Sequence, residues 1–204
     1  MTTRLLHDGN FGLRCAEWAA RELGGAPSCA IDLAASIDTS GWEPEDTAIA
    51  FLSSASAQPL IELSGALRQK LVWTSTYLYP TSIRIGPLVT RSGACFDCAT
   101  RRYQSQPGDM GTLRLQKVLL GATASPRFDM VPDSVAAMAA MAALRQLAEP
   151  ALPGGYIQRL DFLDHTTGEA VALPVHGCAC GGPVAAERLG RERFVRLLER
   201  DLGA

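Results

Sequence analysis

The chain has 204 residues, of which 47% are hydrophobic and 20% charged, and its formal net charge is −2. This composition is that of an ordinary globular protein and excludes a wholly disordered chain. No basic surplus is available to neutralise phosphates, so nucleic-acid binding is not expected as a main activity. No apolar run reaches the roughly 20 residues of a membrane helix, and the first residues do not form a signal peptide. We therefore expect a cytoplasmic protein with one sizeable domain that binds neither nucleic acid nor membrane.

The first part of the sequence predicts strands that alternate with helices. In chain order, the predicted elements are a strand at residues 3–6, a turn at 8–12, a helix at 13–23, strands at 28–33 and 47–52, a helix at 58–70 and a strand at 71–78. The strand at 47–52 is short and apolar, as expected of a buried parallel strand. Such alternation is typical of an α/β sheet with crossover helices.

The second part is less regular. It predicts a strand at 83–89, a capped helix at 131–147, strands at 156–163 and 169–175 around a turn at 166–168, and an amphipathic helix at 185–202. The region 103–132 contains several glycines and prolines and gives no clear prediction. The helix at 131–147 is nearly all Ala, Met and Leu, so we expect most of its surface to be buried against the sheet or a second subunit.

Two close pairs of cysteines are the most informative chemical feature. Two residues separate Cys95 from Cys98, and one residue separates Cys178 from Cys180 much later in the chain. Structural Zn²⁺ binds four such ligands tetrahedrally, with sulfur at about 2.3 Å, and leaves no open position for substrate. Because a one-residue gap strains chelation by both cysteines of a pair, a site in which His176 replaces one cysteine is an alternative, as is a protein without metal.

The remaining cysteines, Cys15 and Cys29, are isolated in apolar surroundings. We expect them to be buried as small hydrophobic side chains with no redox or nucleophilic role. Disulfides are not expected in a cytoplasmic chain of this size.

The segment before the first cysteine pair resembles a known family. Ile85-Gly86-Pro87-Leu88-Val89 leads to Gly93-Ala94-Cys95 and Cys98, and Arg101-Arg102 follow. This pattern is similar to the ThiF/MoeB-type, ubiquitin-activating-like fold, and most similar to the ThiF-like component of cyclodehydratases that form thiazoles and oxazoles with a YcaO protein. The resemblance covers residues 49–181. In the family the second pair is usually C-x-x-C after His-Pro, where this sequence has C-x-C after His176-Gly177.

The resemblance implies a truncated Rossmann-like α/β sheet of the ThiF/MoeB type, with a four-cysteine zinc knuckle and a C-terminal amphipathic helix. We expect residues 1–182 to form this domain with its zinc site, and residues 183–204 to form a helical segment that could dock a partner. Arg101 and Arg102 could neutralise the negative charge of a zinc site with four thiolates, or could form salt bridges with nearby acids.

Active members of the family adenylate a carboxylate and need a glycine-rich phosphate loop. Here the corresponding turn is Gly9-Asn10-Phe11-Gly12, in which Phe11 is bulky and a third glycine is missing. Asp32 has the position expected of a ribose contact, with an ordinary strand-end carboxylate as the alternative. Ser53-Ser54 stand where an aspartate would contact metal and triphosphate. We therefore expect a degenerate nucleotide site and no catalytic residues in this chain.

By this resemblance, the chain is expected to be a non-catalytic subunit of an azoline-forming complex in the maturation of ribosomal peptides. A YcaO partner would use the ATP, and the partners would be that protein, a precursor peptide and a second copy of this chain. Fuller family members hold the leader peptide with an N-terminal winged-helix segment; none precedes the first predicted strand, so leader binding is expected elsewhere. The alternatives are an ATP-dependent adenylating enzyme with a divergent loop and a stand-alone zinc-bearing binding module.

Overall fold

The computed structural model describes residues 2–25, 28–30, 39–53, 58–67, 71–79, 81–90, 93–105, 131–162, 164–175, 177–178 and 180. Its strands are β1 (Thr3–Asp8), β2 (Ser28–Ala30), β3 (Thr47–Leu52), β4 (Val72–Leu78), β5 (Ser82–Ile85), β6 (Tyr156–Asp161) and β7 (Thr167–Val171). Its helices are α1 (Gly9–Glu22), α2 (Gln58–Leu67), α3 (Phe96–Ser105) and α5 (Asp133–Ala148). The predicted helix at 185–202, and most of the region 103–132, lie outside the described residues.

The strands form one mixed sheet in the order β2-β1-β3-β4-β5-β6-β7. The pairs within β2-β1-β3-β4 are parallel, and those from β4 to β7 are antiparallel. The parallel half confirms the α/β fold expected from the alternating pattern. Short turns between neighbouring strands are possible in the antiparallel half, where β4 and β5 follow each other directly.

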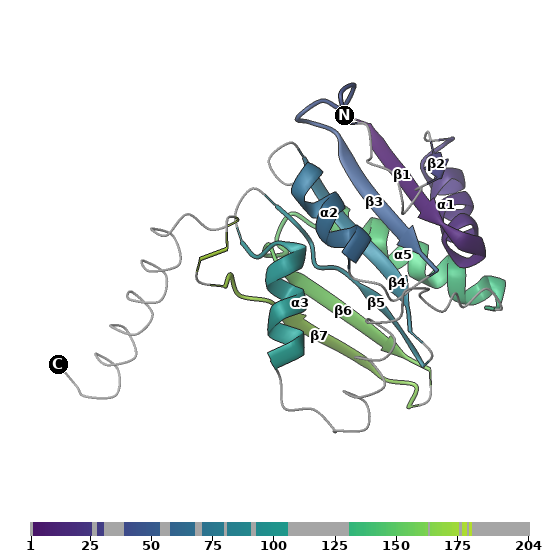
Figure 1. Ribbon diagram of the computed structural model, residues 1–204. Helices are drawn as coiled ribbons and strands as arrows, with labels where there is room; N and C mark the ends of the chain where they lie inside the picture. The colour runs from purple at the N-terminus through teal and green to yellow at the C-terminus, as the bar shows by residue number, and fades with distance from the viewer. Residues whose placement is uncertain are drawn as a thin grey trace.

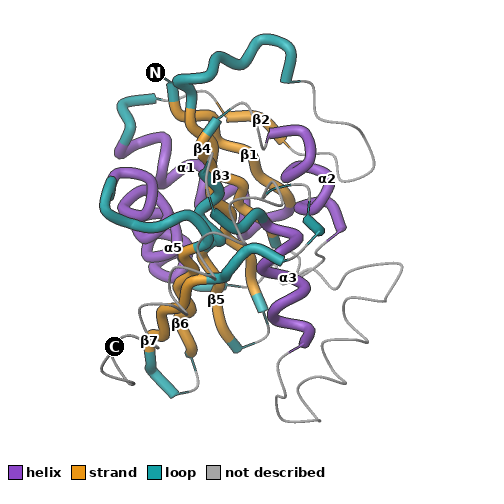
Figure 2. The backbone as a smooth tube through the Cα atoms, turned by 90° about the vertical axis from the view of Figure 1, so that its left-hand side faces the viewer, coloured by secondary structure: helices purple, strands orange, loops and turns teal. Residues whose placement is uncertain are grey.

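Different helices cover the two faces of the sheet: α1 and α5 pack on one face, and α2 and α3 on the other (Figures 1 and 2). Because side chains alternate along a strand, Leu5 and Ile49 lie in the core under α1 and α5. Leu6 and Ala50 lie in the core under α2 and α3. Each face therefore has its own apolar core, and β3 belongs to both because it is buried at every position.

The junction of β1 and α1 differs from the prediction. The sequence predicts a turn at 8–12, but β1 continues to Asp8 and α1 begins at Gly9 with no turn between them. Asp8 is still paired with Leu52 of β3, and Gly9 makes the change of direction alone with φ of 65°, which glycine adopts without steric cost.

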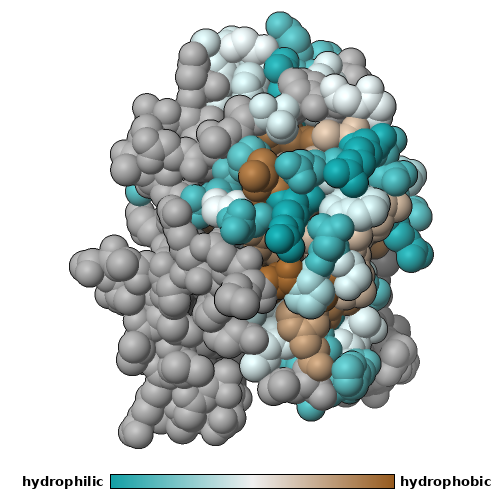
Figure 3. All heavy atoms as spheres, turned by 90° about the vertical axis from the view of Figure 1, so that its right-hand side faces the viewer, coloured by the Kyte–Doolittle hydropathy of each residue, from teal (hydrophilic) through white to brown (hydrophobic). Residues whose placement is uncertain are grey.

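Helix α5 is buried along one stripe and not on most of its surface. Its buried side chains include Ala136, Ala139, Ala140 and Ala143, which allow a close approach to α1. Met138 and Met141 are about half exposed, at 45% and 47%. On the side of the molecule shown in Figure 3, the surface of the described residues mixes hydrophilic and apolar areas. The predicted cap is also wrong, since no side chain caps the helix and Pro132 occupies the N-cap position.

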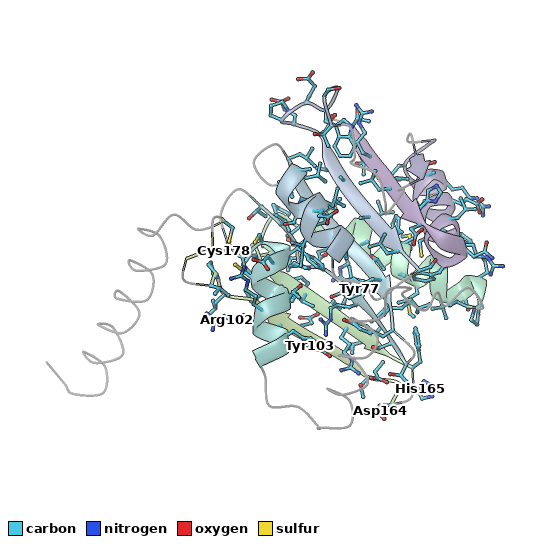
Figure 4. The ribbon with its side chains drawn as sticks, viewed as in Figure 1. Tyr77, Arg102, Tyr103, Asp164, His165 and Cys178 are labelled. Carbon is cyan, nitrogen blue, oxygen red and sulfur yellow. The ribbon has the colours of Figure 1, made fainter. Side chains whose placement is uncertain are left out.

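Several element boundaries in the antiparallel half also differ from the prediction. Strand β5 ends at Ile85 and not at residue 89, since Pro87 has no N–H for a sheet ladder and Gly86 has φ of 106°. The turn between β6 and β7 comes earlier than predicted and contains Asp164 and His165 (Figure 4). Strand β7 therefore starts at Thr167 and ends at Val171. Among the described residues, no helix is both long and apolar enough to cross a bilayer.

Candidate metal centre

The fold brings both cysteine pairs together. The sulfur atoms of Cys95, Cys98, Cys178 and Cys180 all lie within 4.8 Å of one another. Cys95 Sγ is 3.6 Å from Cys178 Sγ, and Cys98 Sγ is 3.1 Å from Cys180 Sγ. None of these distances is that of a disulfide, which is about 2.05 Å. The four thiols, which are far apart in the sequence, therefore form one compact cluster.

The cluster lies where α3 meets the segment that follows β7. Cys95 immediately precedes α3 and Cys98 is in its first turn, so the short gap of the first pair is a consequence of helical winding. The second pair comes after β7, and Cys178 lies near the N-terminal end of α3 (Figure 4). Cys95, Cys98 and Cys178 are buried, with exposed fractions of 4%, 0% and 7%.

The donor set and its spacing fit a tetrahedral zinc ion. Four sulfur atoms at 2.3 Å from a central ion would be about 3.8 Å apart, and the observed contacts of 3.6 and 3.1 Å come close to that value. The other sulfur–sulfur distances are all within 4.8 Å. The cluster could therefore hold a metal ion, with a chemistry compatible with zinc.

Polar groups around the cluster hold its sulfur atoms in place. The backbone N–H of Val175 donates a hydrogen bond to Cys98 Sγ at 3.2 Å, which is the kind of contact that orients a metal ligand. Asp97 Oδ2 is 3.9 Å from Cys178 Sγ and forms a salt bridge with Arg101 at 2.9 Å. Of the two predicted roles of Arg101, the structure therefore shows the salt bridge.

Burial raises the pKa of the Cys95 thiol to about 11 and raises the pKa of Cys98 as well. A metal ion binds thiolates, so it has to displace protons that these thiols hold at neutral pH. Cys15, on α1, is also buried and its pKa is raised by burial. It lies in the apolar core under α1 and α5, as predicted for an unreactive cysteine. The side chain of Cys29 and the residues Asp32 and His176 lie outside the described part of the structure.

The N-terminus of α1, where a nucleotide phosphate would bind, is occupied by the protein's own groups. Ser53 Oγ accepts a hydrogen bond from the N–H of Gly12 at 3.2 Å and donates one to the carbonyl oxygen of Asp8 at 2.8 Å. Asp8 is itself buried, directly before the helix, and its carboxylate would repel a phosphate. Phe11 is in the core. Each of these features disfavours binding of a triphosphate at this helix end.

A cluster of one arginine and three tyrosines was not predicted from the sequence. The guanidinium of Arg84 lies 3.9 Å from the ring centre of Tyr103 on α3 and also faces the rings of Tyr77 and Tyr79. Its NH1 donates a hydrogen bond to the Tyr77 hydroxyl at 3.2 Å. The only signal in the sequence is a charged residue between Ile83 and Ile85 in a short apolar strand, which alternation alone explains equally well.

Comparisons with known proteins find similarity in structure only. No protein-family model matches the sequence, and no curated protein matches it. An E. coli microcin synthetase McbBCD complex contains a chain with a TM-score of 0.63 and 13% identity, over 88% of this chain and 68% of that chain. A heterocyclase in complex with substrate and cofactor has a TM-score of 0.56 and 15% identity, over 89% of this chain. The heterocyclase TruD has a TM-score of 0.51 and 16% identity, over 95% of this chain.

The matched region is only part of the heterocyclases: it spans 25% of one chain and 29% of the other. At these identities the likeness concerns the fold. The resemblance inferred from the Gly-Pro-Leu-Val and cysteine motifs is confirmed at this level. This chain shares its fold with a chain of the microcin synthetase complex and with part of the two heterocyclases, and it has a four-cysteine cluster that could hold a metal ion.

Proposed function

We propose that this chain is a zinc-stabilised, non-catalytic subunit of an azoline-forming cyclodehydratase complex. It would present a ribosomal precursor peptide to a separate YcaO ATPase, or support the activity of that partner. In such a reaction, a Cys, Ser or Thr side chain attacks the preceding amide carbon. ATP activates the amide oxygen, and that oxygen leaves as phosphate when the ring forms. None of these steps would take place on this chain.

The observation that most supports this function is the fold shared with a microcin synthetase chain over 88% of this chain. A second observation favours a non-catalytic role over adenylation. Ser53 and the buried Asp8 fill the first turn of α1, where an adenylating enzyme would bind its triphosphate. The fold would thus be retained as a scaffold after loss of the nucleotide site.

Cys95, Cys98, Cys178 and Cys180 would hold the zinc ion. With four protein ligands the ion would be structural, because no position is left for water or substrate. Its role would be to fix α3 to the segment after β7, which Arg102 also contacts by donating hydrogen bonds to the carbonyl oxygens of Leu173 and Pro174.

Purification of the tagged chain from its host, with identification of all bound proteins by mass spectrometry, tests this function. We expect a YcaO protein and a short peptide rich in Cys, Ser or Thr. Mixing the purified proteins with ATP should then remove one water molecule from the peptide per ring, and omission of this chain should abolish or strongly slow that loss. A reaction that runs equally fast without the chain would contradict the proposal.

ATP–pyrophosphate exchange by the pure chain separates the proposed scaffold from an adenylating enzyme. We expect no exchange, and we expect a folded Asp32→Ala variant to support ring formation as well as the wild type does. Exchange that is lost in Asp32→Ala would instead indicate a working nucleotide site. Recovery of the chain with no YcaO protein, and without exchange, would favour a stand-alone binding module.

A further inference from the structure

Strand β7 is an edge of the sheet in the described part of the chain. It is the last strand in the order, paired with β6 on one side, and no strand in the described ranges pairs with it on the other. All five of its residues are exposed. An edge strand with exposed peptide groups can accept an extended segment of another chain as an additional strand.

The register of β6 and β7 identifies which peptide groups face outward. Ala172 donates its N–H to Gly155, and Ile157 is paired with Ala170 and Arg159 with Gly168. In an antiparallel pair, hydrogen-bonded residues alternate with residues whose N–H and C=O point away. The outward groups of β7 therefore belong to Thr167, Glu169 and Val171. These three residues offer a ladder long enough for a short peptide.

A hollow of about 410 Å³ lies beside this edge, between α3 and strands β5, β6 and β7. On the face toward α3, β7 presents only Gly168, Ala170 and Ala172, which leave the hollow open because their side chains are so small. Figure 4 places Arg102 and Tyr103 on α3 above these strands. A side chain from a strand added to β7 could thus pass over Gly168 into the hollow.

Positive charge predominates in the hollow. Arg84 and Arg159 are paired across β5 and β6, so both lie on this face, in one row with Gly168, and Arg102 lines the hollow from α3. Asp161 forms a salt bridge with Arg159 at 2.5 Å. Glu169 also lines the hollow, but alternation along β7 places its side chain on the opposite face, where burial and the Glu169 carboxylate raise the pKa of Tyr156.

Arg84 contributes a buried charge. It is 8% exposed, its neighbours are tyrosine rings, and no carboxylate in the described residues forms a salt bridge with it. A buried cation surrounded by rings and without a carboxylate creates a favourable potential for an anion that enters the hollow.

We propose, on the basis of the function proposed above, that the outer edge of β7 binds an extended peptide that carries an acidic residue. The peptide pairs with Thr167, Glu169 and Val171, and its carboxylate enters the hollow, near Arg159 and in the field of Arg84. Backbone pairing supplies most of the affinity, and the arginines supply the preference for an acidic side chain.

Two fluorescein-labelled heptapeptides of alternating threonine and valine, one with glutamate and one with glutamine at the centre, test this binding mode. Fluorescence anisotropy with the full, zinc-loaded chain should give about tenfold tighter binding of the glutamate peptide at low salt. High salt should reduce that preference. Equal binding of the two peptides, or no binding of either, would overturn the inference.

Two variants separate the backbone contacts from the charge contacts. Val171→Pro removes an outward N–H that β6 does not use, so the fold should persist while both peptides bind about tenfold more weakly. Arg159→Gln should leave the glutamine peptide unaffected and lower the preference for glutamate below about threefold. Arg21→Gln, on α1 at the other face of the sheet, is the matched control and should change the binding of neither peptide.

Ala170→Leu fills the hollow and provides an independent test if Val171→Pro does not fold. This substitution should weaken binding of the glutamate peptide more than binding of the glutamine peptide. Wild-type binding by both Val171→Pro and Ala170→Leu would overturn the inference. Undiminished ring formation in a complex containing Val171→Pro would overturn this binding mode and leave the proposed function intact. If the chain binds the peptides as described but copurifies with no YcaO protein, the binding mode stands and the proposed function is overturned.

Discussion

The carbonyl oxygen of Phe51 lies 2.3 Å from the point that a Cβ atom on Gly12 would occupy. Real Cβ atoms do not approach a backbone oxygen so closely, so α1 can lie against β3 only because residue 12 is a glycine. The same contact holds the first turn of α1 near Ser53, which follows β3. The arrangement at the start of α1 is therefore fixed by backbone packing as well as by the hydrogen bonds of Ser53.

Gly12→Ala should destabilise the protein by about 1–3 kcal/mol, the usual cost of forcing an extra methyl group into a packed site. Urea unfolding followed by circular dichroism measures this loss. Gly65→Ala is the matched control: it lies in α2 with nothing within 4 Å of its added Cβ, and should stabilise the helix by about 0.5–1 kcal/mol. Equal effects of the two substitutions would contradict the packing described for Gly12.

Cys95→Ser should release the metal and lower the melting temperature together. Structural zinc contributes roughly 10–16 kcal/mol in small zinc-finger peptides, so its loss should be large here as well. Metal analysis and thermal unfolding of the same samples give both quantities. Cys15→Ala, which removes a buried cysteine outside the cluster, should retain the metal. If Cys95→Ser changes neither quantity, these cysteines do not form a zinc site.

Gln146 connects α5 to two strands of the sheet. It is 3% exposed; its Oε1 accepts a hydrogen bond from the Thr74 hydroxyl, and its Nε2 donates one to the carbonyl oxygen of Tyr156 at 3.1 Å. Gln146→Leu would remove the Gln146 acceptor of the buried Thr74 hydroxyl and should cost about 1–3 kcal/mol, while the Tyr156 carbonyl keeps the N–H of Leu88 as a donor at 2.8 Å. In a double-mutant cycle, adding Thr74→Val should recover part of that loss. Strict additivity would argue against the direct contact.

Asp46 should contribute stability that disappears in acid. Its pKa is lowered, chiefly because the N–H of Thr2 donates a hydrogen bond to the carboxylate at 2.9 Å, with further help from Glu43 and Arg4. A lowered folded-state pKa stabilises the protein above the unfolded pKa of about 3.9, and this stability is lost as the pH falls below it.

Asp46→Asn should accordingly be less stable than the wild type at pH 7, with a difference that shrinks below about pH 4. Urea midpoints at a series of pH values measure the difference. Glu45→Gln, at the exposed neighbouring position, serves as the control and should follow the wild type. A difference that stays constant down to pH 2 would show that the charge of Asp46 is not responsible.

The sequence predicted elements well where local patterns decide the structure. The apolar run at 47–52 became β3 with the predicted bounds, and the Gln58 helix began at the predicted residue. The cysteine pairs were correctly recognised as belonging together, because thiols at such spacing have a specific coordination chemistry.

Other features depend on contacts between distant segments and could not be predicted in this way. The sequence does not predict helix α3, since the cysteine motif that overlaps it indicates a zinc knuckle. The start of α1 was displaced because Gly9 and Gly12 indicate a turn locally, while pairing of β1 with β3 extends the strand to Asp8. The environment of Arg84 comes from β4 and α3, and nothing in its own strand indicates it.

The position of the cysteine cluster also sets an order of events during synthesis. Cys178 is 83 residues later in the chain than Cys95, so at about 5–20 residues per second a ribosome needs roughly 4–17 seconds to make the stretch between them. During that interval, only Cys95 and Cys98 of the four clustered cysteines have been made. An ion that bound at this stage would have two of the four clustered cysteines as ligands, and the other two could join it only after the segment with Cys178 and Cys180 had been made.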